Sequence, residues 1–445
     1  MRINSIEINN FRGFVNKSFE LNPQMNVIVG NNTSGKTTIL HAIQIALGAY
    51  LQSLTIIPKD RSYRKNFAIS DKTMLFNASK DDFFFVDGNP TIAVDATVIS
   101  KGKQKGWLYS ENKRIQWYRE AKGATTVHAR KNVGELMDVV SQWMQYRKSE
   151  DEETNVVLPL VLAFGADRID NNYKLMKKTK ERESKIAKAY KFALHEYVDF
   201  RSALNWIYKY DTTAKNIKEN EGTDRAFFSA LETAAKLKDI VVKDKEMWAT
   251  VRVTGRDEER LTYDMMSSGF KAMVNIVSEI AYRCILLNGW LGENAVKGTP
   301  GVIMIDEVDL YLHPHWQRHV LADLQKAFPN IQFIVTTHSP FVVQSVDSNN
   351  IITLDGDKSP ISPQNRGIEE VASREMGISD ENLRSEKYRK KEDLARRYYE
   401  LVDRGENNPD EIEAVRAALE QLELDEDLMN DPALKALLQF KRGRI

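Results

Sequence analysis

A short glycine-containing segment constrains this chain more than any other feature. Residues 30–37 read Gly-Asn-Asn-Thr-Ser-Gly-Lys-Thr, an apolar run at 27–29 precedes them, and helix-forming residues follow at 38–46. This pattern between a strand and a helix is typical of a loop whose backbone N–H groups surround a polyphosphate. Glycine permits the sharp backbone turns, and the amino end of the helix adds partial positive charge. The segment predicts a nucleoside triphosphate site.

Two side chains of this loop have tasks that follow from their chemistry. We expect Lys36 to reach the β- and γ-phosphates and the Thr37 hydroxyl to bind Mg²⁺. The predicted ligands are therefore ATP and Mg²⁺. The residues expected to contact the nucleotide are Gly30, Asn31, Asn32, Thr33, Ser34, Gly35, Lys36, Thr37 and Thr38.

Two further apolar runs end in polar side chains suited to phosphate chemistry. The run at 301–305 leads into Asp306 and Glu307, and the run at 331–335 leads toward His338. An acid such as Asp306 holds Mg²⁺ at a strand end, and Glu307 is placed to orient or deprotonate the attacking water. We expect His338 to sense the γ-phosphate. Because parallel sheets bind ligands at the carboxyl ends of their strands, these residues predict one catalytic site.

Each of these signals also has a plainer interpretation. Taken alone, an Asp-Glu pair at a strand end is more often a solvated turn. A lone histidine there is usually a structural group. The catalytic interpretation is favoured here because both signals accompany the loop that contains Lys36.

The order of the motifs resembles a known group of ATPases. The chain continues with Met-Ser-Ser-Gly-Phe-Lys at 266–271, and Asp309 follows two residues after Glu307. Together with the opening at 6–14, this order is similar to the ABC-type ATPases of the RecF, SMC and OLD families. The resemblance implies an α/β fold, an ABC-type P-loop ATPase head, with Asp309 as the D-loop acid. It also implies that a signature from one subunit caps the γ-phosphate of its neighbour, through Ser267, Ser268 and Gly269.

A narrower resemblance involves residues 158–165, 279–283 and 310–318. These stretches are similar to the short OLD-like ATPases of bacterial anti-phage systems, and most of all to the PtuA ATPase subunits of Septu, which also accompany some retrons. The resemblance implies a homo-oligomer with at least two ATPase heads and a separate HNH nuclease subunit.

One family feature, the glutamine loop, has no obvious counterpart in this sequence. Gln44 and Gln52 both fall early in the chain, and Asp71 is only a possible replacement.

Four regions are expected along the chain. Residues 1–168 form the first part of the head, 169–240 an inserted helical region, 241–350 the second part of the head, and 351–445 a helical extension. The apolar residues of the insertion keep no strict heptad, so a long coiled coil is not expected.

The C-terminal region bears on nuclease activity. OLD-type nucleases continue into a Toprim domain, whereas here Asp355-Gly356-Asp357 precedes only charged, helix-rich segments. We therefore expect a turn at 355–357 and no nuclease activity in this chain.

The charge balance and the single cysteine indicate which partners and which cellular compartment to expect. Lysine plus arginine and aspartate plus glutamate number 63 each, so no global basic field attracts nucleic acid. Basic clusters at 174–191 and 384–397 nevertheless allow contact with DNA or RNA, although such runs are more often solvated faces.

The single cysteine, Cys284, lies in an apolar run and is expected to be buried filler in a reducing compartment. The N-terminal strand does not resemble a signal peptide, and no apolar run approaches membrane-spanning length, so we expect a cytoplasmic protein without membrane contact.

Three neighbouring histidines have part of the spacing of a metal site. His315 and His319 have the spacing of one helical face, next to His313. Because no cysteine or carboxylate completes a ligand set, metal binding is not expected there.

Two functions fit these observations. The first is an ATP-binding and ATP-hydrolysing subunit of an anti-phage defence complex that regulates an HNH-type nuclease. The second is a RecF- or SMC-like DNA-repair ATPase that acts directly on DNA. The basic clusters favour the second, whereas the neutral net charge and the motif match favour the first.

Overall fold

The computed structural model divides the chain into two compact units, Met1–Gly377 and Ile378–Ile445, which are described separately. In the second unit, helix α11 spans Asp380–Leu383. The residues that the structure describes are 1–77, 81–104, 107–122, 125–147, 156–166, 183–196, 200–209, 222–243, 246–252, 258–354, 362–386, 388–390, 393–394, 396–397, 414–415 and 417.

A five-stranded parallel sheet forms the centre of the first unit. Its strand order is β15-β3-β14-β13-β9, and four of the five strands are buried along their whole length. Such continuous apolar strands suit a parallel sheet covered on both faces. The strands are β3 (Met25–Val29), β9 (Leu160–Phe164), β13 (Gly301–Ile305), β14 (Ile331–Thr336) and β15 (Ile351–Thr353).

The register of this sheet places the three predicted motifs at one edge. Ile305 lies beside Val335, and Thr336 lies beside Ile28, so β3, β13 and β14 end together. Strand β14 lies between β3 and β13. The chain segments that follow β3 and β13 therefore both lie next to the end of β14, as the sequence predicts.

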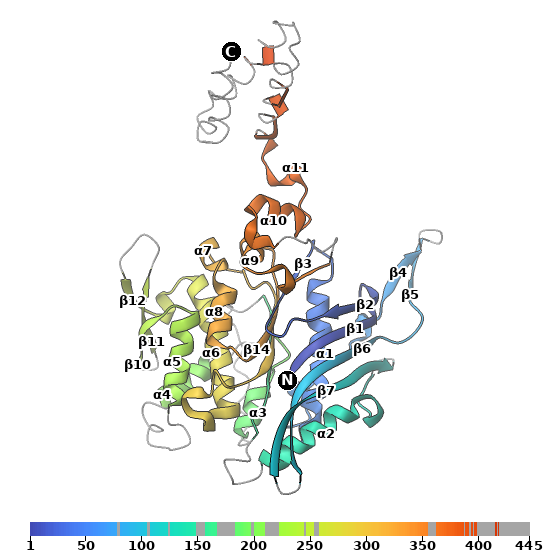
Figure 1. Ribbon diagram of the computed structural model, residues 1–445, viewed down its shortest axis with the longest axis vertical. Helices are drawn as coiled ribbons and strands as arrows, with labels where there is room; N and C mark the ends of the chain where they lie inside the picture. The colour runs from blue at the N-terminus through green and yellow to red at the C-terminus, as the bar shows by residue number, and fades with distance from the viewer. Residues whose placement is uncertain are drawn as a thin grey trace. The chain divides into compact units, whose positions relative to one another are not determined.

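Helices cover the sheet on both sides (Figure 1). Helix α1 lies on one side of β3 and β14, and α5, α6 and α8 lie on the other. Helix α6 is buried over most of its 21 residues and contacts α3, α4 and α5. The main helices are α1 (Lys36–Ser53), α2 (Arg130–Arg147), α3 (Lys185–Tyr190), α4 (Phe200–Lys209), α5 (Thr223–Ala234), α6 (Ser268–Asn288) and α8 (Val320–Ala327). Shorter helices are α7 (Pro314–Gln317), α9 (Pro340–Gln344) and α10 (Ile368–Arg374).

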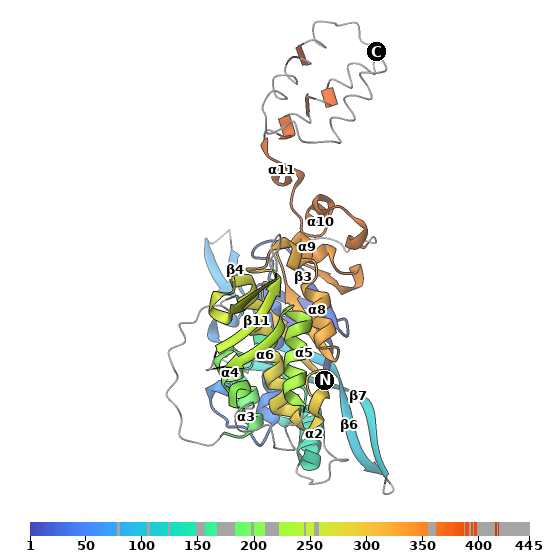
Figure 2. The same cartoon turned by 90° about the vertical axis from the view of Figure 1, so that its left-hand side faces the viewer.

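A second, antiparallel sheet covers α1. Its order is β2-β1-β6-β7-β8, and β6 and β7 form the long hairpin visible in Figure 2. The indole of Trp117 on β7 is buried and donates to the carbonyl of Ala46 in α1 at 3.0 Å. The strands are β1 (Arg2–Phe11), β2 (Phe14–Glu20), β6 (Thr91–Gln104), β7 (Trp107–Lys122) and β8 (Thr125–Val127).

Two smaller sheets complete the first unit. Strands β4 (Met74–Asn77) and β5 (Asp82–Phe85) form a hairpin. Strands β10 (Lys238–Lys243), β11 (Glu246–Arg252) and β12 (Glu258–Thr262) form an antiparallel sheet that precedes α6.

The observed helices and strands can be compared with the four regions expected from the sequence. The mixed α/β head with a phosphate-loop helix is confirmed, and the described part of residues 169–240 contains α3, α4 and α5. Strand β15 adds residues 351–353 to the central sheet, just beyond the position where we expected the head to end. The Asp355-Gly356-Asp357 turn lies outside the described residues.

Two further findings concern burial and membranes. Cys284 is fully buried in α6, which confirms the predicted burial, and this burial raises the pKa of its thiol to about 12. Along the described residues, no helix is both long and apolar enough to cross a bilayer.

Candidate active site

The loop between β3 and α1 has the shape that its glycines predict. Gly35 stands just before α1 with a φ of 103°, in the left-handed region. A Cβ at this position would lie 2.6 Å from Cζ of Phe14, so a larger residue would meet the β2 side chain. Glycine is thus required at position 35 for two reasons, the left-handed backbone conformation and the close packing against Phe14.

Lys36 lies folded over the loop. Its side chain is only 7% exposed, and Nζ donates to the carbonyls of Gly30 at 2.7 Å and Asn31 at 2.9 Å. The buried Ser34 hydroxyl has no hydrogen-bond partner among the described residues. A cation and an unused hydroxyl in one turn of chain fit the oxygen atoms of a phosphate group.

Thr37 and Asp306 meet although they are far apart in sequence. The Thr37 hydroxyl donates to Oδ2 of Asp306 at 3.0 Å, and the Thr336 hydroxyl donates to Oδ1 at 2.5 Å. These hard oxygen ligands fit Mg²⁺, which is held in phosphate sites by one or two protein oxygens together with the phosphates. When bound, the ion neutralises charge on the phosphates. Thr37 and Asp306 are the residues that would hold it.

Thr336 also fixes the backbone of Glu307. The backbone N–H of Glu307 donates to the Thr336 hydroxyl at 2.7 Å. Glu307 has a φ of 48°, a conformation that disfavours side chains with a Cβ and that the surrounding contacts must maintain. One hydroxyl on β14 thus positions both acids that follow β13.

Asp309 connects the segments that follow β13 and β14. Its Oδ1 accepts from the Thr337 hydroxyl at 2.5 Å and from the backbone N–H of His338 at 3.3 Å. The His338 side chain itself is exposed. Gln317 adds a second link, because its Oε1 accepts from the Ser339 hydroxyl at 2.6 Å. The position of His338 therefore depends on the loop that begins at Glu307.

Three site residues were not predicted from the sequence, namely Thr336, Thr337 and Gln317. Thr336 and Thr337 stand directly before His338, so two hydroxyls next to a predicted site residue were a usable signal. Gln317 gave no such signal, because its partner Ser339 is 22 positions away in sequence and comes within reach only in the folded chain.

The signature residues lie at the amino end of α6. Ser267 precedes the helix, Ser268 is its first residue, and both side chains are exposed. A Cβ on Gly269 would lie 2.8 Å from the carbonyl oxygen of Tyr311. Gly269 therefore allows α6 to approach the loop that follows Glu307, while both serines face outward.

The three candidates for the glutamine loop have other partners. Gln44 is buried in α1 and donates to Glu196 at 2.9 Å, and Gln52 donates to Asn66 at 3.0 Å. Asp71 accepts from Nε of Arg12 and from the backbone N–H of Ala68, both at 2.7 Å. Both Asp71 oxygens are therefore engaged in structural contacts.

The neighbouring histidines form no evident metal site. Nδ1 of His313 accepts from the backbone N–H of His315 at 3.3 Å, which caps α7. Within the part of the chain that the structure describes, no group of three His, Cys, Asp or Glu side chains suits a metal ion.

The amino-acid sequence of this chain matches a known protein family. Residues 5–243, more than half of the 445-residue chain, match the AAA domain. The chain belongs to the AAA domain family. A second match, to an AAA domain described as a putative AbiEii toxin of a type IV toxin–antitoxin system, covers residues 165–344. This AAA protein is an ATPase with an ABC-type head.

Two relatives extend over most of this AAA ATPase. It is 24% identical to the retron Vc95 probable ATPase of Vibrio cholerae, over 92% of this chain and 85% of the relative. It is also 24% identical to the retron Ec83 probable ATPase of Escherichia coli, over 79% of this chain and 71% of that relative.

Further relatives share less with this AAA ATPase. The Septu protein PtuA of Bacillus thuringiensis is 40% identical over 21% of this chain and 23% of its own length. A solved SMC head bound to the C-winged helix domain of ScpA is 15% identical, with a TM-score of 0.42 over 79% of this chain and 94% of that chain. The PtuA and retron matches confirm the resemblance stated from the motifs.

Proposed function

We propose that this ATPase is a subunit of a bacterial anti-phage defence complex, in which ATP-bound heads pair and regulate an associated HNH-type nuclease. The observation that carries the ATPase chemistry is the contact of Thr37 with Asp306, because it unites two distant motifs at one sheet edge. The relatives named as retron probable ATPases and as Septu PtuA support the defence role. The retron Vc95 relative matches 92% of this chain, whereas the PtuA match covers 21% of it.

The residues have distinct roles in the proposed reaction. Lys36 and the loop N–H groups bind the phosphates, while Thr37 and Asp306 hold Mg²⁺. Glu307 orients or deprotonates the water whose oxygen bonds to the γ-phosphorus. The bond from that phosphorus to the bridging oxygen breaks, giving ADP and phosphate. His338, held through Asp309, contacts the γ-phosphate.

A second copy of the chain completes the proposed site. The amino end of the 21-residue helix α6 carries partial positive charge and exposes Ser267 and Ser268. In a pair of heads, each α6 caps the γ-phosphate bound by the other, with Gly269 permitting close approach. Because pairing then requires ATP, nucleotide state controls the geometry of whatever the heads carry.

The alternative function, direct action on DNA, rests on the basic clusters. Lys185 and Lys188 are exposed in α3. Other described members are partly neutralised, since Lys191 pairs with Glu183 at 2.5 Å and Lys390 pairs with Glu386 at 2.8 Å. These ion pairs reduce the charge available for phosphates, so the defence complex remains the preferred proposal.

Native mass spectrometry tests the proposal. The chain is purified alone and with a co-expressed genomic neighbour, and each sample is weighed with and without ATP and Mg²⁺. We expect a stable assembly of several ATPase copies bearing a second, nuclease-like subunit. The Lys36→Ala variant serves as the control for ATP dependence. A monomer that pairs only with ATP and then binds DNA, with no second subunit, would support the alternative instead.

A further inference from the structure

A pocket of about 400 Å³ lies beyond the carboxyl end of α1, away from the nucleotide loop. Gln52 in the last turn of α1 lines it, whereas Lys36 begins the same helix. At 1.5 Å per residue, the two positions are about 24 Å apart along the helix axis. The pocket is therefore separate from the site described above.

A buried guanidinium stands behind the wall of this pocket. Arg119 on β7 is 0% exposed, its Nη2 donates to Oδ1 of Asn66 at 2.8 Å, and its Nη1 lies 3.5 Å from Nδ1 of His128. Both of these partners line the pocket. No carboxylate among the described residues pairs with Arg119, and its buried Nε has no hydrogen-bond partner there. Burial lowers its pKa to about 10, so the group stays charged at neutral pH.

A buried hydroxyl adds a second unused donor. Tyr63 lines the pocket, is 2% exposed, and its hydroxyl has no hydrogen-bond partner among the described residues. Burial, and then the charges of Glu183 and Asp60, raise the pKa of Tyr63, so the phenol remains neutral and able to donate. These two carboxylates are engaged elsewhere. Glu183 pairs with Lys191, and Asp60 accepts from the backbone N–H of Ser62 at 2.7 Å.

The lining of the pocket is basic. It includes Lys59 and Arg64 but no aspartate or glutamate. Burial, and then the nearby charges of Arg119, Lys59 and Arg64, lower the pKa of His128 to about 4, so its ring is neutral at pH 7. Lys59 also donates to the carbonyl of Gln52 at 3.2 Å, and so offsets the partial negative charge at the end of α1.

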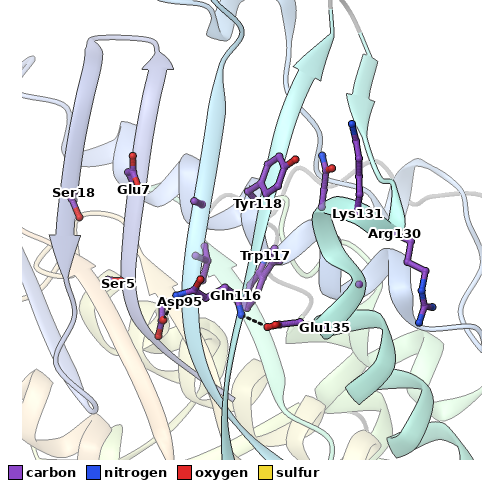
Figure 3. A pocket seen from close by; sticks show the side chains of 14 residues that line it. Ser5, Glu7, Ser18, Asp95, Gln116, Trp117, Tyr118, Arg130, Lys131 and Glu135 are labelled. Carbon is purple, nitrogen blue, oxygen red and sulfur yellow. Dashed lines mark hydrogen bonds between the residues drawn. The ribbon is translucent and has the colours of Figure 1, made fainter.

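A larger pocket on the antiparallel sheet lacks this excess of basic side chains. It measures about 440 Å³, and Figure 3 shows acidic and basic side chains on its walls. Asp95 accepts from Arg114 at 2.7 Å and from Gln116 at 2.8 Å, and Glu135 accepts from the backbone N–H of Gln116. Because acidic and basic side chains line this pocket together, it offers no excess of positive charge for an anion.

We propose that the basic pocket at the end of α1 binds the phosphate monoester of a nucleotide, either free or at the end of a nucleic-acid strand. Arg64 and Lys59 supply charge at the mouth, Tyr63 donates from the wall, and Arg119 supplies the buried positive field. The volume exceeds that of a bare phosphate and falls within the range of small-ligand pockets. Gln52 and Asn66 add amide groups for the rest of the nucleotide.

Calorimetric titration of the full chain tests this site. The Lys36→Ala variant is used throughout, because it removes nucleotide binding at the other end of α1. The probes are AMP, adenosine, and one trinucleotide with either a 5′-phosphate or a 5′-hydroxyl. We expect AMP or the phosphorylated trinucleotide to bind at least tenfold more tightly than its counterpart without phosphate.

Two variants and a matched control locate the binding. Arg64→Ala and Tyr63→Phe should each weaken binding about tenfold, whereas Arg61→Ala, an exposed neighbour outside the pocket lining, should leave it unchanged. Equal affinity for AMP and the trinucleotide identifies a free nucleotide, and tighter binding of the trinucleotide identifies a strand end. Equal affinity with and without phosphate, or unchanged binding in Arg64→Ala, overturns the proposal. Either result leaves the proposed defence role intact.

Discussion

At the scale of single residues, one hydroxyl organises both acids of the site. Thr336 donates to Asp306 and accepts from the backbone N–H of Glu307. Neither acid is therefore held by its own strand alone. The orientation of the site depends on a side chain from the neighbouring strand β14.

Replacement of Thr336 by valine should slow hydrolysis and leave ATP binding nearly unchanged. Valine keeps the shape but removes both hydrogen bonds, and groups left unpaired cost about 1–3 kcal/mol. We expect kcat to fall roughly 10- to 100-fold, since each 1.4 kcal/mol is a factor of ten. Steady-state kinetics with a separate ATP titration measures both quantities. Thr336→Ser keeps the hydroxyl and should restore most of the rate; failure of this rescue would indicate a packing role.

Replacement of Glu307 by glutamine should preserve ATP binding but slow turnover by about 10²–10⁴-fold, the usual contribution of a general base. The amide has nearly the same size and cannot accept a proton. Single-turnover hydrolysis of radiolabelled ATP gives the rate, and Glu111→Gln on an exposed part of β7 provides the control. Turnover equal to that of the unmodified protein would remove Glu307 as the base.

At the scale of elements, strand β13 leads directly into the two acids and requires a glycine at its start. A Cβ on Gly301 would lie 2.1 Å from the carbonyl oxygen of Leu160 in the paired strand β9. The parallel sheet at this point therefore has room for backbone only. The same strand ends at Ile305, directly before Asp306, so its placement decides where the acids lie.

Gly301→Ala should destabilise the head by about 1–3 kcal/mol, the usual cost of overpacking. Chemical denaturation followed by circular dichroism measures the change in the free energy of unfolding. Gly13→Ala is the matched control, because a Cβ there meets nothing within 4 Å. Similar stability of the two variants would contradict the close contact between β13 and β9.

At the scale of the whole molecule, the signature serines and the nucleotide loop belong to different parts of the first unit. Ser267 and Ser268 lie at the start of α6, outside the hydrogen-bonded group formed by Thr37, Asp306 and Thr336. Their exposure leaves them available to another copy of the chain. The proposed active site is thus divided between two molecules.

Ser268→Arg should leave ATP binding nearly intact while hydrolysis falls, because the bulky cation blocks approach of the second head. Added unmodified subunits should rescue the rate only partly, since mixed pairs retain one intact composite site. ATP titration and hydrolysis assays at several mixing ratios test this, with Ser18→Arg on exposed β2 as control. Full activity of Ser268→Arg alone would show that α6 does not act in a neighbouring site.

The sequence by itself determined the local parts of this ATPase. The loop at 30–37, the strands before Asp306 and His338, and the burial of Cys284 follow from local pattern, because glycine conformation and apolar periodicity act over a few residues. The tertiary structure decided how these parts meet. Thr336 bridges two acids, Asp309 holds the His338 backbone, and Arg119 lies buried behind a basic pocket. These contacts join residues from separate strands and loops, so only the register and packing of the folded sheets bring them within hydrogen-bonding distance.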